Sequence, residues 1–106
     1  MNNPFGITDK SYLVILDALK QCAEIEKATI FGSRAKRNYK AGSDIDIAIA
    51  GRHCTMQTAV SLENYLNEEA PVPFHVDVVC YNQLKHAELK DHIDKVGKDF
   101  YKPTRP

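Results

Sequence analysis

Two aspartates separated by a single residue are the first candidates for chemistry in this chain. Asp44 and Asp46 open a segment, residues 44–50, in which aspartate and alanine alternate with isoleucine. Alternation with period two predicts a strand, and residues two apart on a strand project from the same face. Two carboxylates that close repel each other unless a cation lies between them, and Mg²⁺ bound by carboxylates and substrate phosphates meets that need. The alternative is an acidic pair on an exposed strand face that binds nothing.

A second candidate is the tripeptide Gly32-Ser33-Arg34, which follows an expected strand over residues 27–31. Glycine at the end of a strand allows the backbone to approach a ligand. A helix that opens at Arg34 directs its first N–H groups toward the same corner, which suits an anion. Ser33 offers a hydroxyl donor to a phosphate oxygen, and Arg34 offers a charge-assisted contact. The alternative is a helix cap followed by a turn, without any ligand.

Asp77 is a third acid that needs an explanation. It interrupts a mostly apolar segment, residues 74–81, where an acid is rarely fully buried without a partner. One interpretation is a residue at the edge of a strand that faces solvent. The other is a third carboxylate beside Asp44 and Asp46, which shares a metal ion or accepts a proton from an attacking hydroxyl.

Alternating helices and strands must position these residues. The helices are expected to begin at Thr8 or Asp9, at Thr55 and at Asn82. Helical spacing in the second, with one polar interruption, runs along Met56, Ala59, Val60, Glu63 and Leu66. The strands are expected over residues 27–31, 44–50 and 74–81, with a short edge strand at residues 100–101. This order predicts an α/β or α+β fold in which helices pack on a small mixed sheet.

Length and composition set further limits. The chain has 106 residues, so we expect one domain over residues 1–106, and its formal net charge of zero argues against general nucleic-acid binding. The three cysteines, Cys22, Cys54 and Cys80, are odd in number and form no metal-binding spacing, which favours a reduced, cytoplasmic protein. The histidines show no ligand spacing either, and we expect them on the surface. The longest apolar run, residues 12–16, is far too short to span a bilayer.

The combination of these motifs is more specific than its parts. A Gly-Ser pair at a strand end, a D-x-D on the next strand and an acid on a later strand resemble the signature of the DNA polymerase β-like nucleotidyltransferase superfamily, over about residues 30–79. In that superfamily the Gly-Ser pair holds the triphosphate, and the three acids bind two Mg²⁺ ions. The resemblance therefore implies the nucleotide-binding residues Gly32, Ser33 and Arg34, and the catalytic, metal-binding residues Asp44, Asp46 and Asp77.

The activity implied by this resemblance is transfer of a nucleoside monophosphate, AMP from ATP in our expectation, to an acceptor hydroxyl with release of pyrophosphate. The short chain resembles the minimal members of the superfamily, which pair with helical HEPN proteins in toxin–antitoxin systems and act as the antitoxin. A side-chain hydroxyl on such a partner is then the expected acceptor. One departure is Arg37, because many minimal members have glycine at this position, which bears on the shape of the phosphate loop.

Two other functions stay open at this point. The domain is a non-catalytic antitoxin if it neutralises a helical toxin by contact alone. It is an enzyme for small molecules if the acceptor hydroxyl belongs to a compound such as an aminoglycoside, although the chain is short for a separate acceptor surface. The sequence does not decide the oligomeric state, and a homo-oligomer stays open.

Overall fold

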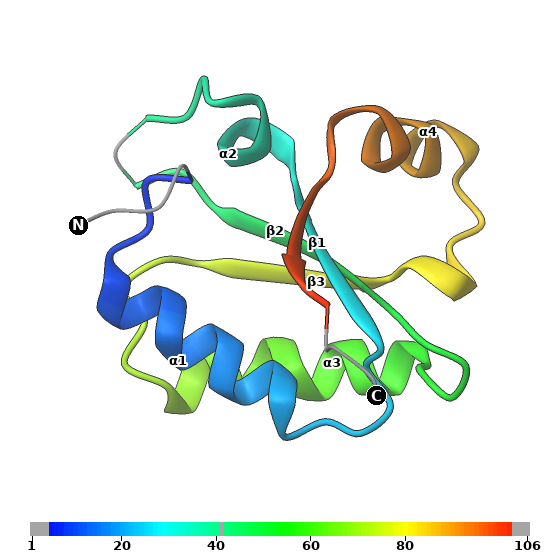
Figure 1. Cartoon of the computed structure of the whole chain (residues 1–106), viewed down its shortest axis with the longest axis horizontal. Coiled ribbons are helices and arrows are strands. Elements are labelled where there is room, and N and C mark those ends of the chain that lie inside the picture. The colour runs from blue at the N-terminus through cyan, green and yellow to red at the C-terminus, as the bar shows by residue number, and fades with distance from the viewer. Residues whose placement is uncertain (1–4, 41, 103–106) are drawn as a thin grey trace.

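The fold is built on a four-stranded mixed sheet, seen in a computed structural model that describes residues 5–40 and 42–102. The strands are β1 (Lys27–Phe31), β2 (Ile45–Ala50), β3 (Val76–Cys80) and β4 (Lys98–Tyr101). Their order in the sheet is β3-β2-β1-β4 (Figure 1). β1 pairs antiparallel with both β2 and β4, whereas β2 and β3 are parallel. The predicted α+β fold with a small mixed sheet is thus confirmed.

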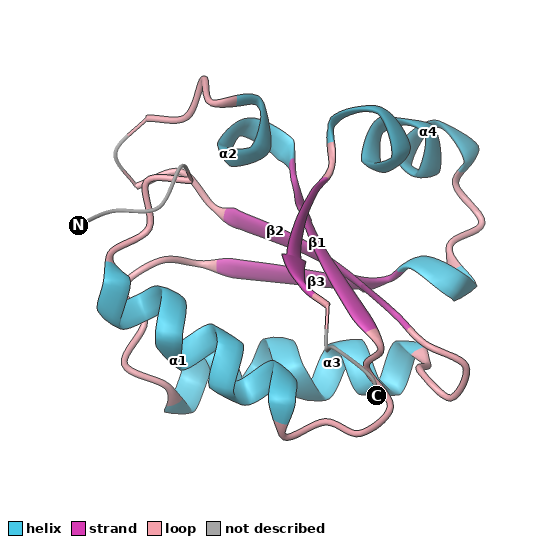
Figure 2. Cartoon of the chain, viewed as in Figure 1, coloured by secondary structure: helices cyan, strands magenta, loops and turns pink. Residues whose placement is uncertain are grey.

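Helices cover the sheet from two sides (Figure 2). They are α1 (Asp9–Lys20), α2 (Gly32–Lys36), α3 (Met56–Asn64), which continues into the π-helical turn Tyr65–Glu69, and α4 (Ala87–Val96). α1 and α3 lie on one side of the sheet, and α2 and α4 lie on the other (Figure 1). Within residues 5–40 and 42–102, no helix combines the length and apolar composition needed to cross a membrane.

The main core lies between the sheet and the α1–α3 layer. The isoleucines of β2, Ile45, Ile47 and Ile49, are fully buried there, as the period-two pattern predicted. A smaller cluster of Phe31, Ala48 and Ile93 joins α4 to the opposite face of the sheet. Because α4 covers only part of that face, the acidic residues that alternate with the buried isoleucines keep access to solvent.

Two details of the predicted helices are wrong. Asn82 does not cap α4, because its side chain accepts a hydrogen bond from the Gly51 N–H at 2.9 Å, and α4 begins after His86. Of the spacing expected for the second helix, Met56 and Val60 are 43% and 46% exposed, whereas Ala59 and Leu66 are buried as expected, together with Leu62. The face that carries Leu62 and Leu66 packs against the core, because these two side chains bury a large apolar surface there.

Side chains from the α3 region close the outer edge of β3. The Asn67 side chain donates to the Val76 carbonyl at 2.8 Å and accepts from the Val76 N–H at 2.9 Å. A carboxylate oxygen of Glu63 accepts from the Val78 N–H at 2.8 Å. An edge strand normally exposes such groups as a template for another strand, and here the first part of the β3 edge is bonded within the chain.

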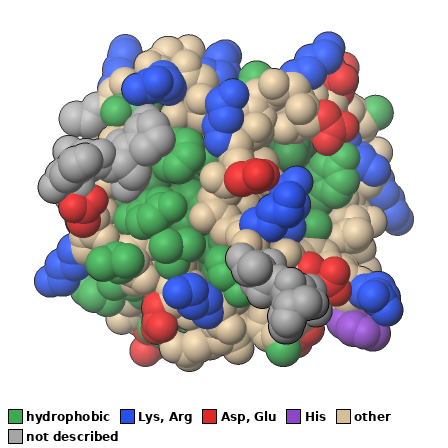
Figure 3. Space-filling model, viewed as in Figure 1, with side chains coloured by type: hydrophobic (Ala, Val, Ile, Leu, Met, Phe, Trp, Pro, Cys, Tyr) green, Lys and Arg blue, Asp and Glu red, His purple; other side chains and the backbone are tan. Residues whose placement is uncertain are grey.

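The surface carries both charges on the face that Figure 3 shows. Lys and Arg side chains are spread over this face, several of them on its α2 and α4 side, and acidic side chains lie scattered among them (Figure 3). Hydrophobic side chains gather between α1 and α2 (Figure 3). This face therefore combines both signs with an apolar region, in keeping with a formal net charge of zero for the whole chain.

Candidate active site

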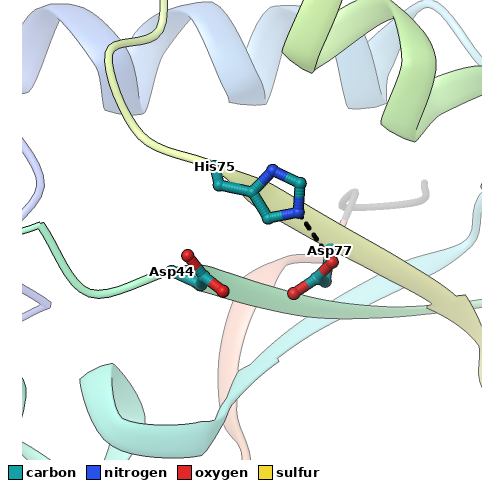
Figure 4. Close-up of side chains that lie close together, drawn as sticks. All are labelled: Asp44, His75 and Asp77. Atoms are coloured by element: carbon teal, nitrogen blue, oxygen red, sulfur yellow. Dashed lines mark hydrogen bonds and ion pairs between the residues drawn. The ribbon is translucent and has the colours of Figure 1, made fainter.

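Three acidic residues meet at one corner of the sheet, where β1 ends and β2 and β3 begin. The strand register places Asp46 directly opposite both Asp77 on β3 and Phe31 at the end of β1. Asp44 lies one residue before β2 and is exposed. A carboxylate oxygen of Asp44, a ring nitrogen of His75 and a carboxylate oxygen of Asp77 lie within 4.8 Å of one another (Figure 4). The fold therefore gathers the three acids of the sequence motif.

Gly32 closes this corner from the side of β1. It follows Phe31 directly and has a φ of +74°, a left-handed conformation that side chains with a Cβ adopt only with strain. A Cβ at Gly32 would also collide with Oδ2 of Asp46. The Gly32 N–H donates to Nε2 of His92 on α4 at 3.3 Å, and Ser33 follows, half-buried, in the first turn of α2. The expected phosphate loop and the acids therefore adjoin each other.

The loop after α2 takes the turn that glycine favours, although it contains arginine. Arg37 ends the helix with φ 64° and ψ 24°. Its N–H donates to the Arg34 carbonyl at 3.3 Å, and the Asn38 N–H donates to the Ser33 carbonyl at 3.1 Å. A left-handed arginine costs about 1 kcal/mol relative to an ordinary conformation. The departure from glycine at this position thus leaves the loop closed by regular helix-end hydrogen bonds.

Asp46 is the acid whose negative charge is least tolerated. Burial, and then the charges of Asp77 and Asp44, raise the pKa of Asp46 to about 6 from an ordinary value of 3.8. A hydrogen bond to Asp77 raises this pKa as well, while the charge of His92 opposes the shift. A divalent cation among the carboxylates would offset both the repulsion and the lost hydration. The donor set therefore fits a hard divalent cation held by oxygens of Asp44, Asp46 and Asp77.

A family model described as Polymerase beta, Nucleotidyltransferase matches residues 14–105. The chain belongs to the polymerase β nucleotidyltransferase family. The matched range contains Gly32 and Ser33 and the three aspartates of the acidic corner of this nucleotidyltransferase, Asp44, Asp46 and Asp77. A comparison with curated proteins finds no match.

Several solved structures share the fold of this nucleotidyltransferase. A chain of a toxin–antitoxin complex crystallised with AMP-PNP has a TM-score of 0.71 and 20% identity, covering 87% of this chain and 73% of that chain. A complex of a tri-AMPylated Shewanella oneidensis HEPN toxin with its MNT antitoxin gives 0.66 and 19% identity, covering 89% and 71%. An MntA–HepT toxin–antitoxin complex gives 0.67 and 18% identity, covering 91% and 74%. At identities this low, the structural similarity establishes only that the fold is shared.

Arg34 of the nucleotidyltransferase is buried, which differs from the expectation that it contacts a phosphate. The side chain is 1% exposed. Its Nη1 donates to the carbonyls of Phe5 at 2.8 Å and Gly6 at 3.2 Å. Its Nε and Nη2 both donate to the Ser43 carbonyl, at 3.1 Å and 2.9 Å. Backbone carbonyls therefore occupy most of the guanidinium donors that a phosphate would need.

Two aromatic rings complete the environment of Arg34. The centroids of Tyr39 and Phe74 lie 4.9 Å and 4.8 Å from its Cζ, and such cation–π contacts favour a desolvated guanidinium. Phe74 precedes His75, and Ser43 precedes Asp44. Arg34 therefore contacts the chain directly before two residues of the acidic corner, the site formed by Asp44, Asp46, His75 and Asp77. The structure thus shows Arg34 as a buried side chain that bonds backbone carbonyls next to the site, and its contact with a phosphate stays a prediction.

We expect Arg34→Lys to lower the free energy of unfolding by about 2 kcal/mol, because lysine keeps the charge but cannot bond the buried carbonyls as a planar fork. Urea unfolding followed by circular dichroism measures the change. Arg37→Lys is the matched control, since Arg37 is exposed, and we expect a change within about 0.5 kcal/mol there. Equal losses in both variants would show that the Arg34 hydrogen bonds do not support the fold.

Two histidines near this corner escaped the sequence interpretation. Nε2 of His75 lies 3.0 Å from Oδ1 of Asp77. The signal for His75 was present, because it lies two residues before Asp77 on the same strand face. His92 had no such signal, since it comes from α4 and lies 60 residues from the Gly32 N–H that it contacts.

Proposed function

We propose that this nucleotidyltransferase transfers AMP from ATP to a hydroxyl group on a helical HEPN-type protein, with Mg²⁺ as cofactor, and thereby acts as the antitoxin of that protein. The observation that carries the proposal is the contact between Gly32 and Asp46, where any added Cβ would collide with the carboxylate. A nucleoside triphosphate needs a phosphate loop and a metal site side by side, and this contact joins the two.

In the proposed reaction, the acceptor oxygen bonds to the α-phosphorus and gives up its proton to a carboxylate of the site or to water. The bond from that phosphorus to the bridging oxygen breaks with release of pyrophosphate. Asp44, Asp46 and Asp77 would hold the divalent cation, which supplies charge neutralisation for the triphosphate and the leaving group. Gly32 lets its backbone approach the triphosphate, and the Ser33 hydroxyl donates to a phosphate oxygen. Catalysis then consists mostly of positioning and electrostatic stabilisation.

The choice of nucleotide and acceptor is supported by the complexes of similar fold. One was crystallised with AMP-PNP, and another contains a tri-AMPylated HEPN toxin together with an MNT antitoxin. Transfer requires the acceptor hydroxyl to come within about 3–3.5 Å of the α-phosphorus. The acidic corner lies at the rim of the sheet, with Asp44 exposed, so an acceptor on another protein can approach it.

The test mixes the purified chain, Mg²⁺, labelled ATP and a candidate partner, the product of the adjacent gene, followed by mass spectrometry of both proteins. We expect one or more AMP groups on a Tyr, Ser or Thr of the partner, and none when the chain carries Asp46→Asn. Neutralisation of the toxin without any modification, and unaffected by Asp46→Asn, would instead identify a non-catalytic antitoxin. Modification of neither protein, with transfer to a small molecule, would identify a different acceptor.

A further inference from the structure

The acidic corner contains a nitrogen donor as well as oxygens. Asp44 and Asp77 each present a carboxylate oxygen within 4.8 Å of a ring nitrogen of His75. Nε2 of His75 is also 3.0 Å from Oδ1 of Asp77, and the three side chains turn toward one another (Figure 4). The proposed function uses the three acids and gives this imidazole no role.

The backbone fixes the imidazole beside Asp44. The Ile45 N–H, at the start of β2, donates to the His75 carbonyl at 2.9 Å, so the ladder between β2 and β3 extends to His75, the residue before β3. His75 and Asp77 share one face of β3, because they are two residues apart. The side chains of His75 and Asp77 are 57% and 44% exposed, which leaves them room to rotate toward a common ion.

We propose that His75 is a nitrogen ligand of a divalent cation bound with Asp44 and Asp77, and that the site therefore prefers a transition-metal ion such as Mn²⁺ to Mg²⁺. This inference rests on the metal site of the proposed function. Mg²⁺ prefers oxygen ligands and retains several waters, whereas imidazole nitrogen favours transition metals. Two carboxylates and one imidazole form a mixed donor set that accommodates Mn²⁺. The cation replaces the hydrogen bond that joins His75 to Asp77.

The test uses Mn²⁺ as the probe on the whole chain, with and without a non-hydrolysable ATP analogue. Electron paramagnetic resonance of free Mn²⁺ gives the affinity of the protein for Mn²⁺. Displacement of bound Mn²⁺ by added Mg²⁺ gives the affinity for Mg²⁺. We expect wild type to bind Mn²⁺ roughly 10-fold or more tightly than Mg²⁺, and His75→Gln to lose most of that preference. Glutamine offers an amide oxygen in place of the nitrogen, so Mg²⁺ binding is expected to change little.

A spectroscopic signature identifies the ligand directly. Pulsed electron paramagnetic resonance of bound Mn²⁺ is expected to show nitrogen hyperfine coupling in wild type and none in His75→Gln. His53→Gln is the matched control, because His53 is exposed in the loop at the other end of β2, and it is expected to keep the coupling.

The inference and the proposed function fail in different ways. Two results overturn the role of His75 and leave AMP transfer untouched. One is bound Mn²⁺ without nitrogen coupling in wild type. The other is the same ratio of Mn²⁺ affinity to Mg²⁺ affinity in wild type and His75→Gln. Absence of AMP transfer with either ion overturns the proposed function, and nitrogen coupling would then still support the metal ligand. Absence of Mn²⁺ binding in both the presence and absence of the ATP analogue overturns the metal site itself.

Discussion

Asp46→Asn is expected to reduce AMP transfer by about 10³-fold or more, while the melting temperature of the metal-free protein holds or rises. The rate falls because stabilisation of charge in the transition state depends on preorganised groups. Removal of one such group lowers the rate by a factor of this size. The rates are measured with labelled ATP and the partner protein at saturating Mg²⁺. A variant that keeps more than about a tenth of the wild-type rate would contradict a metal-binding role for Asp46.

The stability of this variant has a defined pH dependence. The pKa of Asp46 is raised to about 6 in the folded state from 3.8, so ionised Asp46 destabilises the metal-free fold. The penalty is absent well below pH 3.8, grows as pH rises from 3.8 to about 6 and is complete above that. Because the side chain is partly exposed, we discount the penalty to about 1 kcal/mol, or roughly 4 °C in melting temperature.

Melting curves at pH 4 and pH 8, in the presence of a chelator, test this dependence. Asp46→Asn is expected to gain stability over wild type at pH 8 and to lose most of that advantage at pH 4. Asp91→Asn is the control, since Asp91 is exposed on α4 and pairs only with Lys95 in the described structure. A large drop in melting temperature of Asp46→Asn at pH 8 would mean that the carboxylate is a structural element.

Gly32→Ala is expected to lower the free energy of unfolding by about 3 kcal/mol and the rate of AMP transfer by about 100-fold or more. The positive φ of +74° makes any Cβ unfavourable, and the added methyl group would collide with Oδ2 of Asp46. Relief of that collision requires Asp46 or the loop to move, which separates the phosphate loop from the acids. Chemical denaturation and steady-state rates measure the two effects.

Gly42→Ala separates the collision from the backbone strain. Gly42 has a φ of +85°, but a Cβ there meets no atom within 4 Å. We therefore expect Gly42→Ala to cost about 1 kcal/mol from strain alone and to keep near-normal transfer. If both alanine variants lose the same stability and activity, the contact between Gly32 and Asp46 is not what constrains the site.

The acidic corner was the part of the site that local sequence rules describe best. Period-two alternation placed Asp46 opposite a buried isoleucine face, and the structure has that alternation. The same rule applies to His75, which lies two residues before Asp77 although the histidines match no standard metal-ligand spacing. The general lesson concerns strands, where a two-residue spacing is enough to bring two ligands together.

Arg34 shows why other parts of the site were beyond local rules. Its expected role followed from a motif, whereas its observed role depends on the carbonyls of Phe5 and Gly6, which lie 29 and 28 residues away in the sequence. No periodicity reports such long-range partners. The same holds for Asn82, whose hydrogen bond to Gly51 spans 31 residues and outweighs its local preference for a helix cap.

The side chains that close the outer edge of β3 also bear on the motion of Asp77. Edge strands fray more readily than central strands. A metal-binding side chain on a fraying strand would move by more than the roughly 0.5 Å that a reactive site tolerates. Asp77 lies between Val76 and Val78, whose N–H groups are both held by side chains of the α3 region. Opening of the last turns of that helical region would therefore release the backbone on both sides of Asp77. The precision of the acidic corner thus depends on a helical segment that lies on the opposite side of the sheet.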